Sequence, residues 1–204
     1  MWNYVSVFNR CNFNLTANKL KFKINNKMNK ILTLPIKKVS ENFFNGNIKP
    51  SELSKAALKL SSTLKPLNAY INLTNELANQ QSSDSDDRQK TKKLKGILDG
   101  IPIAIKDNFC TAGQFTTCAS LMLANFVPDY DATVYKRLKD AGAVLIGKTN
   151  LDQFAMGSGT VDSYFGPSKN LWGSNQIKNY ILNDQEFELS NILDKNDNWY
   201  IAGD

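Results

Sequence analysis

Two short apolar runs stand out against the mainly polar residues around them. Residues 101–105 and 143–147 are rich in aliphatic side chains, lack polar alternation and each follow a glycine, so both are predicted to be buried strands. Between them, Asp131 is expected to cap a helix that Gly142 ends. The apolar face of that helix is formed by Val134, Leu138 and Ala141. Strand, helix and strand in this order predict an α/β fold with a crossover connection.

Helical spacing also occurs before the first strand. Apolar residues recur with a helical period over residues 36–44, and Gly46 follows that pattern. A second helix is expected from Pro50, with an apolar face that continues until Pro66 stops it. Residues 68–73 could add a short strand to the sheet. The predicted elements therefore describe a mixed sheet flanked by helices.

Three segments carry polar residues without an apolar period. Residues 79–97 are rich in Ser and Asp and then in Lys, which predicts a solvated linker. Residues 172–198 are rich in Asn and Asp and are interpreted as a surface insertion. Residues 154–166 contain three glycines and predict a flexible polar loop that can approach a ligand closely. That loop lacks the glycine spacings typical of phosphate binding.

The net positive charge of the chain arises from its first 40 residues. Eight Lys and Arg residues and no acidic residue precede Glu41, although the whole chain has a net charge of +6. The remainder is slightly acidic, which argues against a nucleic-acid-binding body. Residues 1–30 are basic, acid-free and scattered with apolar side chains, as in an organelle-targeting segment. We therefore predict an organelle-targeting or disordered leader over 1–30 and a folded portion over 31–204.

Composition excludes several kinds of chemistry. The chain of 204 residues contains no histidine, which removes histidine-based nucleophile activation and histidine-containing zinc sites. The three cysteines have no metal-binding or disulfide-framework spacing, so no metal site is expected. No apolar run approaches the roughly 20 residues of a membrane span.

One lysine lies where an apolar run meets a polar cluster. Lys106 directly follows the run 101–105 and precedes Asp107 and Asn108. A lysine at the end of a buried strand can lose hydration, which lowers its pKa and makes its amine a usable general base. It could equally extend its ammonium group into water. The second run also ends in a lysine, Lys148, so the two polar clusters are expected at the same end of the sheet.

Several blocks together resemble the amidase signature family. In chain order they are Gly100–Asn108, Thr116–Ser120, Tyr130–Val134, Gly142–Ala143, Gly147–Asn150, Phe154–Ser158 and Phe165–Pro167. Shorter likenesses around Pro50 and Leu67 extend the resemblance back to about Ile31. The resemblance implies that the chain forms the N-terminal part of the amidase signature fold and is incomplete with respect to it.

The resemblance also implies a mechanism and the residues that carry it. Members of the family hydrolyse amides with a triad of serine, cis-serine and lysine, and Lys106 matches the lysine. It would accept a proton through the cis-serine and so activate the nucleophilic serine. The substrate-binding loop would be formed by Phe154, Ala155, Met156, Gly157 and Ser158. Both family serines are missing from residues 1–204, so this chain alone is expected to be inactive.

The tRNA-linked branch of the family offers the best match. In that branch the amide is glutamine, and the released ammonia converts Glu-tRNA(Gln) to Gln-tRNA(Gln) in a carbon–nitrogen ligase reaction. The resemblance implies the B and C subunits of an amidotransferase as partners, with ATP and Mg used by the B subunit, and a location in the mitochondrial matrix. Two alternatives remain open: a non-catalytic short form that acts in assembly or interaction, and a general amidase of the same family.

Overall fold

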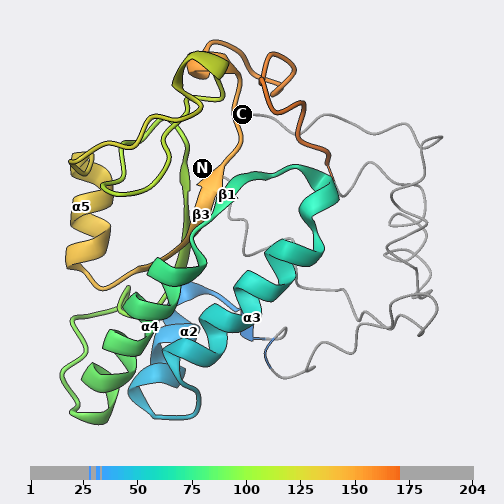
Figure 1. The fold of residues 1–204 in the computed structure, drawn as a ribbon. Helices are drawn as coiled ribbons and strands as arrows, with labels where there is room; N and C mark the ends of the chain where they lie inside the picture. The colour runs from blue at the N-terminus through green and yellow to red at the C-terminus, as the bar shows by residue number, and fades with distance from the viewer. Residues whose placement is uncertain (1–27, 29–30, 33, 171–204) are drawn as a thin grey trace, which may run out of the picture.

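A computed structural model describes residues 28, 31–32 and 34–170 (Figure 1). The helices are α2 (Ile36–Phe44), α3 (Pro50–Thr63), α4 (Asn75–Lys90) and α5 (Thr133–Asp140), and the strands are β1 (Tyr70–Leu73), β2 (Pro102–Lys106) and β3 (Val144–Thr149). Short 3-10 turns are η2 (Lys65–Leu67), η3 (Leu121–Leu123) and η4 (Gln153–Ala155). The insertion predicted at 172–198, and the predicted leader apart from Met28, lie outside the described residues.

The sheet is mixed and has β3 at its centre. Its strand order is β1-β3-β2, with β1 antiparallel and β2 parallel to β3. The parallel pair is joined through α5, so the predicted crossover unit is confirmed. At Gly147 an added Cβ would lie 2.5 Å from the carbonyl oxygen of Asn72, so glycine lets β1 approach β3 at this point.

Helices cover both faces of β3. Val144 and Ile146 pack with Leu58 of α3 and Ala78 of α4, and the helices α3 and α4 lie side by side in Figure 1. Leu145 points to the other face and packs with aromatic and aliphatic side chains that include Tyr135 of α5. The apolar side chains of β3 therefore anchor three helices to one central strand.

The helices before the sheet follow their sequence signals. Residues 36–44 form α2 as predicted, and its buried side chains Val39 and Phe43 join Leu53 of α3 in a separate apolar cluster. Helix α3 begins at Pro50, and the Glu52 carboxylate accepts a hydrogen bond from the backbone N–H of Lys49 at 3.1 Å.

The prediction of a solvated linker over 79–97 is wrong for its first half. Residues up to Lys90 belong to α4, whose buried positions are small: Ala78, Ser82 and Ser85. Tertiary hydrogen bonds hold this polar helix in place. The Gln89 amide donates to the carbonyls of Phe43 and Ile48 at 2.8 and 2.7 Å. Hydropathy therefore misses α4, because its apolar contacts are few, through Leu77 and Ala78 near its start, and polar contacts hold the rest of the helix.

Helix α5 also differs in detail from its prediction. Its N-cap is Ala132, while the Asp131 carboxylate accepts a hydrogen bond from the backbone N–H of Ala112 at 2.7 Å. The buried residue is Tyr135, and Val134 is 50% exposed. The prediction is therefore wrong for Val134, whose place on the buried face is taken by Tyr135, whereas Leu138 packs against the sheet as expected.

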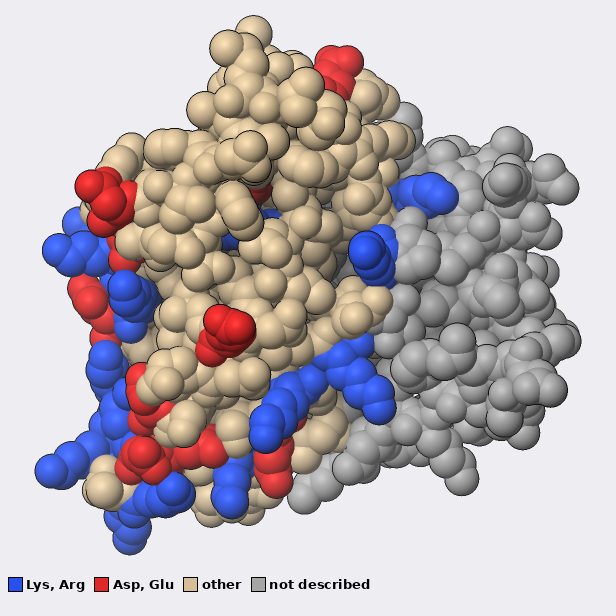
Figure 2. Space-filling view, viewed as in Figure 1, with Lys and Arg blue, Asp and Glu red and all other residues tan. Residues whose placement is uncertain are grey.

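Charge is unevenly distributed over the surface. Figure 2 shows one face on which charged side chains gather along the lower and left edges, while its upper part is mostly uncharged. Among the described residues, no helix is long and apolar enough to cross a membrane.

Candidate active site

The two polar clusters predicted at one end of the sheet do meet there. In the parallel ladder Ile105 pairs with Lys148 and Lys106 pairs with Thr149. The backbone N–H of Asp107 extends the ladder by donating to the carbonyl of Thr149 at 3.1 Å. Lys106 is thus the last residue of β2, at the strand end where it was predicted. It is partly exposed, whereas Lys148 on the central strand is buried.

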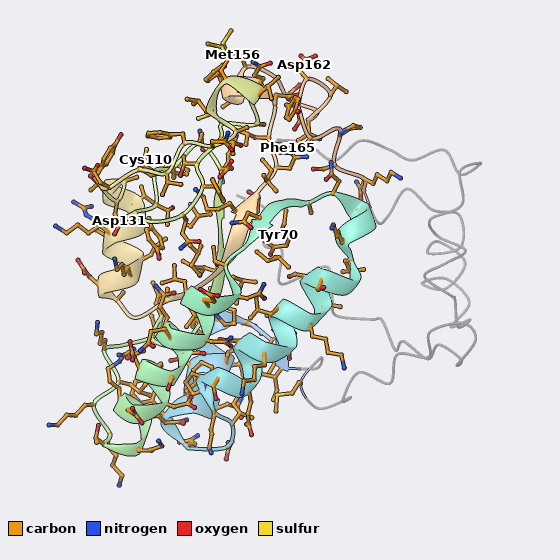
Figure 3. All side chains as sticks on the ribbon, in the orientation of Figure 1. Tyr70, Cys110, Asp131, Met156, Asp162 and Phe165 are labelled. Atoms are coloured by element: carbon orange, nitrogen blue, oxygen red, sulfur yellow. The ribbon has the colours of Figure 1, made fainter. Side chains whose placement is uncertain are left out.

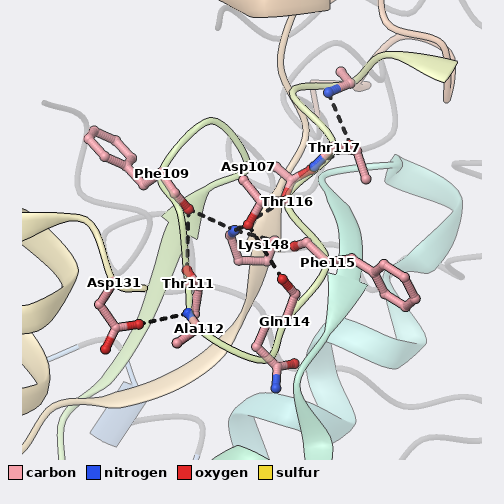
Figure 4. Close-up of polar contacts among 11 residues, drawn as sticks. Asp107, Phe109, Thr111, Ala112, Gln114, Phe115, Thr116, Thr117, Asp131 and Lys148 are labelled. Atoms are coloured by element: carbon pink, nitrogen blue, oxygen red, sulfur yellow. Dashed lines mark hydrogen bonds and ion pairs between the residues drawn. The ribbon is translucent and has the colours of Figure 1, made fainter. Parts of the chain in front are cut away.

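Lys148 is held within the loop that follows β2 (Figure 4). Its ammonium group lies 3.1 Å from the Asp107 carboxylate and donates hydrogen bonds to the carbonyl of Phe109 at 2.9 Å and the Thr116 hydroxyl at 3.1 Å. A further contact of 3.4 Å reaches the carbonyl of Phe115. Acceptors therefore surround the charge of a side chain that has no exposed surface.

This environment assigns different roles to the two lysines. Burial lowers the pKa of Lys148, and the attraction of Asp107 opposes that effect. Because the Lys148 amine is enclosed by protein acceptors, it cannot reach an external substrate. Lys106 combines a position at the strand end with partial exposure, which a proton-accepting side chain requires. The geometry therefore favours Lys106 as the candidate base and Lys148 as an anchor of the adjacent loop.

Asp107 fixes the backbone beside Lys106. Its second carboxylate oxygen accepts hydrogen bonds from both the N–H, at 2.8 Å, and the hydroxyl of Thr117. Its carbonyl accepts from the N–H of Cys118 at 3.2 Å. With the Lys148 ion pair, these contacts hold the residue next to Lys106 from several directions.

The 117–120 segment connects this strand end to the loop predicted to bind substrate. The carbonyl of Cys118 accepts from the N–H of Phe154 at 2.9 Å, and the Gln153 amide donates to the hydroxyl of Ser120 at 2.9 Å. The N–H of Tyr164 donates to the carbonyl of Ala119 at 2.9 Å. One short segment therefore bridges Asp107 and residues 154–158.

Backbone strain concentrates at the same junction. Cys118 and Ala119 have φ of 50° and 53°, and Phe154 and Ala155 have φ of 54° and 58°. Each such non-glycine residue costs on the order of 1–3 kcal/mol, and strain of this kind tends to cluster at active sites and ligand clamps. The two strained pairs meet through the hydrogen bond from Phe154 to Cys118.

The 154–158 segment presents its large side chains outward. Phe154 is 44% and Met156 79% exposed, and Figure 3 shows Met156 at the outer end of the molecule. Apolar side chains exposed at a well-anchored backbone are typical of a surface that contacts another group. The flexible loop expected over 154–166 is in fact tied down at several points, since the Asn150 side chain also binds Ser163 and Gly166.

Sequence reasoning missed the groups that hold the site together. It placed Asp107 and Lys148 in the polar clusters but did not predict that they form a buried ion pair, and it did not single out Asp152; all three residues are fully buried. One signal in the sequence could have revealed these contacts: charged and amide residues directly follow both apolar runs. Polar side chains that become buried at such positions must find hydrogen-bond or ionic partners. Within the described residues, no group of three or more potential metal ligands comes together.

The comparisons with known proteins define the class of this chain. The Amidase family model matches residues 52–178, which is more than half of the chain, and the chain therefore belongs to the amidase family. The fold agrees. The structure resembles the native peptide amidase from Stenotrophomonas maltophilia with a TM-score of 0.61 and 33% identity, covering 67% of this chain and 30% of that chain. Fatty acid amide hydrolase gives a TM-score of 0.66 at 21% identity over 72% of this chain and 26% of that chain, which shows the fold alone.

Curated relatives narrow the likeness further. The mitochondrial glutamyl-tRNA(Gln) amidotransferase A subunit of Drosophila pseudoobscura pseudoobscura is 51% identical over 152 residues, which are 74% of this chain and 30% of the relative. The protein of the same name from Aedes aegypti is 53% identical over 145 residues, or 71% and 29% of the two chains. The chain thus spans about 30% of the length of these relatives. The resemblance inferred from its motifs is confirmed.

Proposed function

We propose that this protein acts as the A subunit of a mitochondrial glutamyl-tRNA(Gln) amidotransferase, in which it releases ammonia from glutamine. One observation carries the proposal. Lys106 is the last residue of β2, and hydrogen bonds through Cys118 connect the next residue, Asp107, to the 154–158 loop. This arrangement supports a candidate base and a candidate substrate loop on one connected backbone. The identity of 51–53% to relatives of that name favours glutamine over other amides.

Lys106 would act first as a base and then as an acid. It would accept a proton relayed from the nucleophilic serine, whose oxygen attacks the glutamine side-chain amide. Returning that proton to the departing nitrogen would release ammonia and leave a glutamyl ester, which water then hydrolyses to glutamate. Neither family serine lies within residues 1–204, so this mechanism needs a nucleophile from outside these residues.

The partners follow from the same proposal. The B and C subunits would complete the assembly, and the B subunit would use ATP and Mg to activate Glu-tRNA(Gln) for attack by the ammonia. Residues 1–30 would direct the protein to the mitochondrial matrix. These roles are supported by the names of the relatives and by the basic, acid-free composition of residues 1–30.

The alternatives can be separated by substrate. The protein in a form that includes both family serines, assembled with the B and C subunits, should release ammonia from glutamine faster than from peptide amides or fatty amides. The same assembly should form Gln-tRNA(Gln) when Glu-tRNA(Gln) and ATP are added, and wherever an assembled protein is measured below, it is this one. Preference for peptide or fatty amides would instead identify a general amidase. No amide hydrolysis, combined with stable binding to both partner subunits, would identify an assembly component.

A further inference from the structure

Asp152 is a buried carboxylate that lies just after β3 and immediately before the 154–158 loop. Its side chain accepts three backbone hydrogen bonds from the far side of that loop: from the N–H groups of Gly159 at 3.0 Å, Thr160 at 2.9 Å and Asp162 at 3.0 Å. The hydrogen bond from Asp162 is the largest influence on the carboxyl and, together with the other amides, lowers the pKa of Asp152 against the opposing effect of burial. The group is therefore an anion at neutral pH.

These contacts close the loop at its base. The carboxylate joins the residue before η4 to Gly159 and Thr160, so that residues 154–158 form the intervening span. A Cβ added at Gly157 would clash with the Asp152 carboxylate. The carboxylate thus lies directly against the backbone of the loop, and glycine is the residue that leaves it room.

Apolar packing gives this loop only partial support. Phe154 is 44% and Met156 79% exposed, so neither side chain is anchored in the core. The loop also contains two strained residues, Phe154 and Ala155, which persist only when their surroundings impose the conformation. Polar anchors must supply that constraint, and the Asp152 carboxylate supplies three of them.

We propose that Asp152 is a positioning residue for the amide substrate, which holds the 154–158 loop in its binding conformation through its hydrogen bonds to Gly159, Thr160 and Asp162. The inference rests on the proposed function, because that function assigns substrate contact to the loop. Asp152 itself has no part in the proton transfers assigned to Lys106. Its loss therefore weakens binding of the amide more than it slows the chemical step.

Two substitutions perturb the same contact from opposite sides. Asp152→Asn keeps the shape of the side chain but replaces one acceptor with an N–H₂ group that faces backbone donors. Gly157→Ala leaves the carboxylate intact but displaces it by the clash at the loop backbone. Asp129→Asn is the matched control, since it makes the same chemical change at an exposed site.

Two measurements test the proposal. Hydrogen–deuterium exchange of the assembled protein should show exchange about 10- to 100-fold faster over residues 157–162 in both variants, the range expected for losing hydrogen bonds to a charged group, with β2 and β3 unchanged. Steady-state glutamine hydrolysis should show KM raised by about tenfold or more, with kcat within a few-fold of the parent. The Asp129→Asn control should match the parent in both measurements.

Each result decides a separate claim. Unchanged exchange over 157–162, or a fall in kcat with unchanged KM, would overturn the positioning role. Faster exchange throughout the sheet would also overturn it, by showing a general structural role. If the parent protein releases no ammonia from glutamine, the proposed function fails, and the positioning role for that substrate fails with it. If the parent is fully active but the two variants show no rise in KM, the proposed function stands and the positioning role of Asp152 alone fails.

Discussion

The buried ion pair between Lys148 and Asp107 gives a strong prediction about stability. Lys148→Met replaces the ammonium group with an apolar end of similar length and leaves Asp107 charged and buried. The Asp107 carboxylate would keep its two contacts with Thr117 but lose its countercharge. The carbonyl of Phe109 and the hydroxyl of Thr116 would each lose a hydrogen bond from the ammonium. The loop after β2 should therefore be strongly destabilised.

The size of the effect follows from burial. Both side chains of the pair are almost fully buried, with 0% and 1% exposure. Removing one partner of such a pair costs about 3–5 kcal/mol, because the remaining charge is desolvated without compensation. For a protein of this size, that loss lowers Tm by roughly 6–20 °C. Lys139→Met is the matched control, since Lys139 is 49% exposed and pairs at 3.0 Å with Asp131, whose side chain is 12% exposed. Water screens a pair with one exposed partner, so its loss should cost on the order of 1 kcal/mol.

Urea unfolding followed by far-ultraviolet circular dichroism measures both variants at pH 7. Asp107→Asn alone and its combination with Lys148→Met complete a double-mutant cycle, and the combination removes the uncompensated charge. The loss of unfolding free energy in the double variant should be smaller than the sum of the Lys148→Met and Asp107→Asn losses, with a coupling of about 0.5–3 kcal/mol. If Lys148→Met costs no more than Lys139→Met, the ion pair does not hold the loop and the reasoning is refuted.

Three further predictions concern stability, activity and targeting. Arg88 donates a hydrogen bond to the Asp99 carboxylate at 2.7 Å. Burial would raise the pKa of Asp99, but the hydrogen bonds to its carboxylate, above all the one from Arg88, lower that pKa overall. A lowered folded pKa gives stability that is present above about pH 4 and lost as pH falls through the folded pKa, so Asp99→Asn should lower the urea midpoint at pH 7 and weaken its acid dependence. An Asp99→Asn variant with the same urea midpoint as the parent at pH 7 would contradict a stabilising role of the Asp99 carboxylate. The 204-residue chain alone should release no ammonia from glutamine, because neither serine is present; measurable release above a Lys106→Ala control would disprove that. Residues 1–30 fused to a fluorescent reporter should enter mitochondria, and a diffuse cytosolic signal would remove the targeting role.

The sequence predicted those helices and strands that are buried through apolar side chains. The runs at 101–105 and 143–147 form the parallel strands β2 and β3, and the polar residues that follow them meet at one end of the sheet. Strand β3 is buried as predicted, but β2 is mostly half-buried and Ala104 is exposed. Pro50 and Gly46 mark a helix start and a helix end as expected. In these cases local preference and tertiary burial favour the same structure.

The remaining features depend on contacts that no periodicity reveals. Helix α4 has small polar residues at its buried positions and is attached by hydrogen bonds such as those of Gln89. Three glycines between 154 and 166 predicted flexibility, yet the Asp152 carboxylate orders this stretch from a position outside it. Partners of buried polar groups are set by the fold, so the anchors of the candidate site emerge only from the structure.

The central claim is that Lys106 is the base for glutamine hydrolysis, and Lys106→Ala in the assembled amidotransferase tests it directly. The measurement is Gln-tRNA(Gln) formation with either glutamine or ammonium chloride as nitrogen donor, beside a Lys136→Ala control at an exposed lysine of α5. We expect the rate with glutamine to fall by about 10²–10⁴-fold, as for loss of a general base, while the rate with ammonium chloride stays at the parent level. Retained glutamine-dependent activity in Lys106→Ala, or an equal loss with both donors, would contradict the assignment.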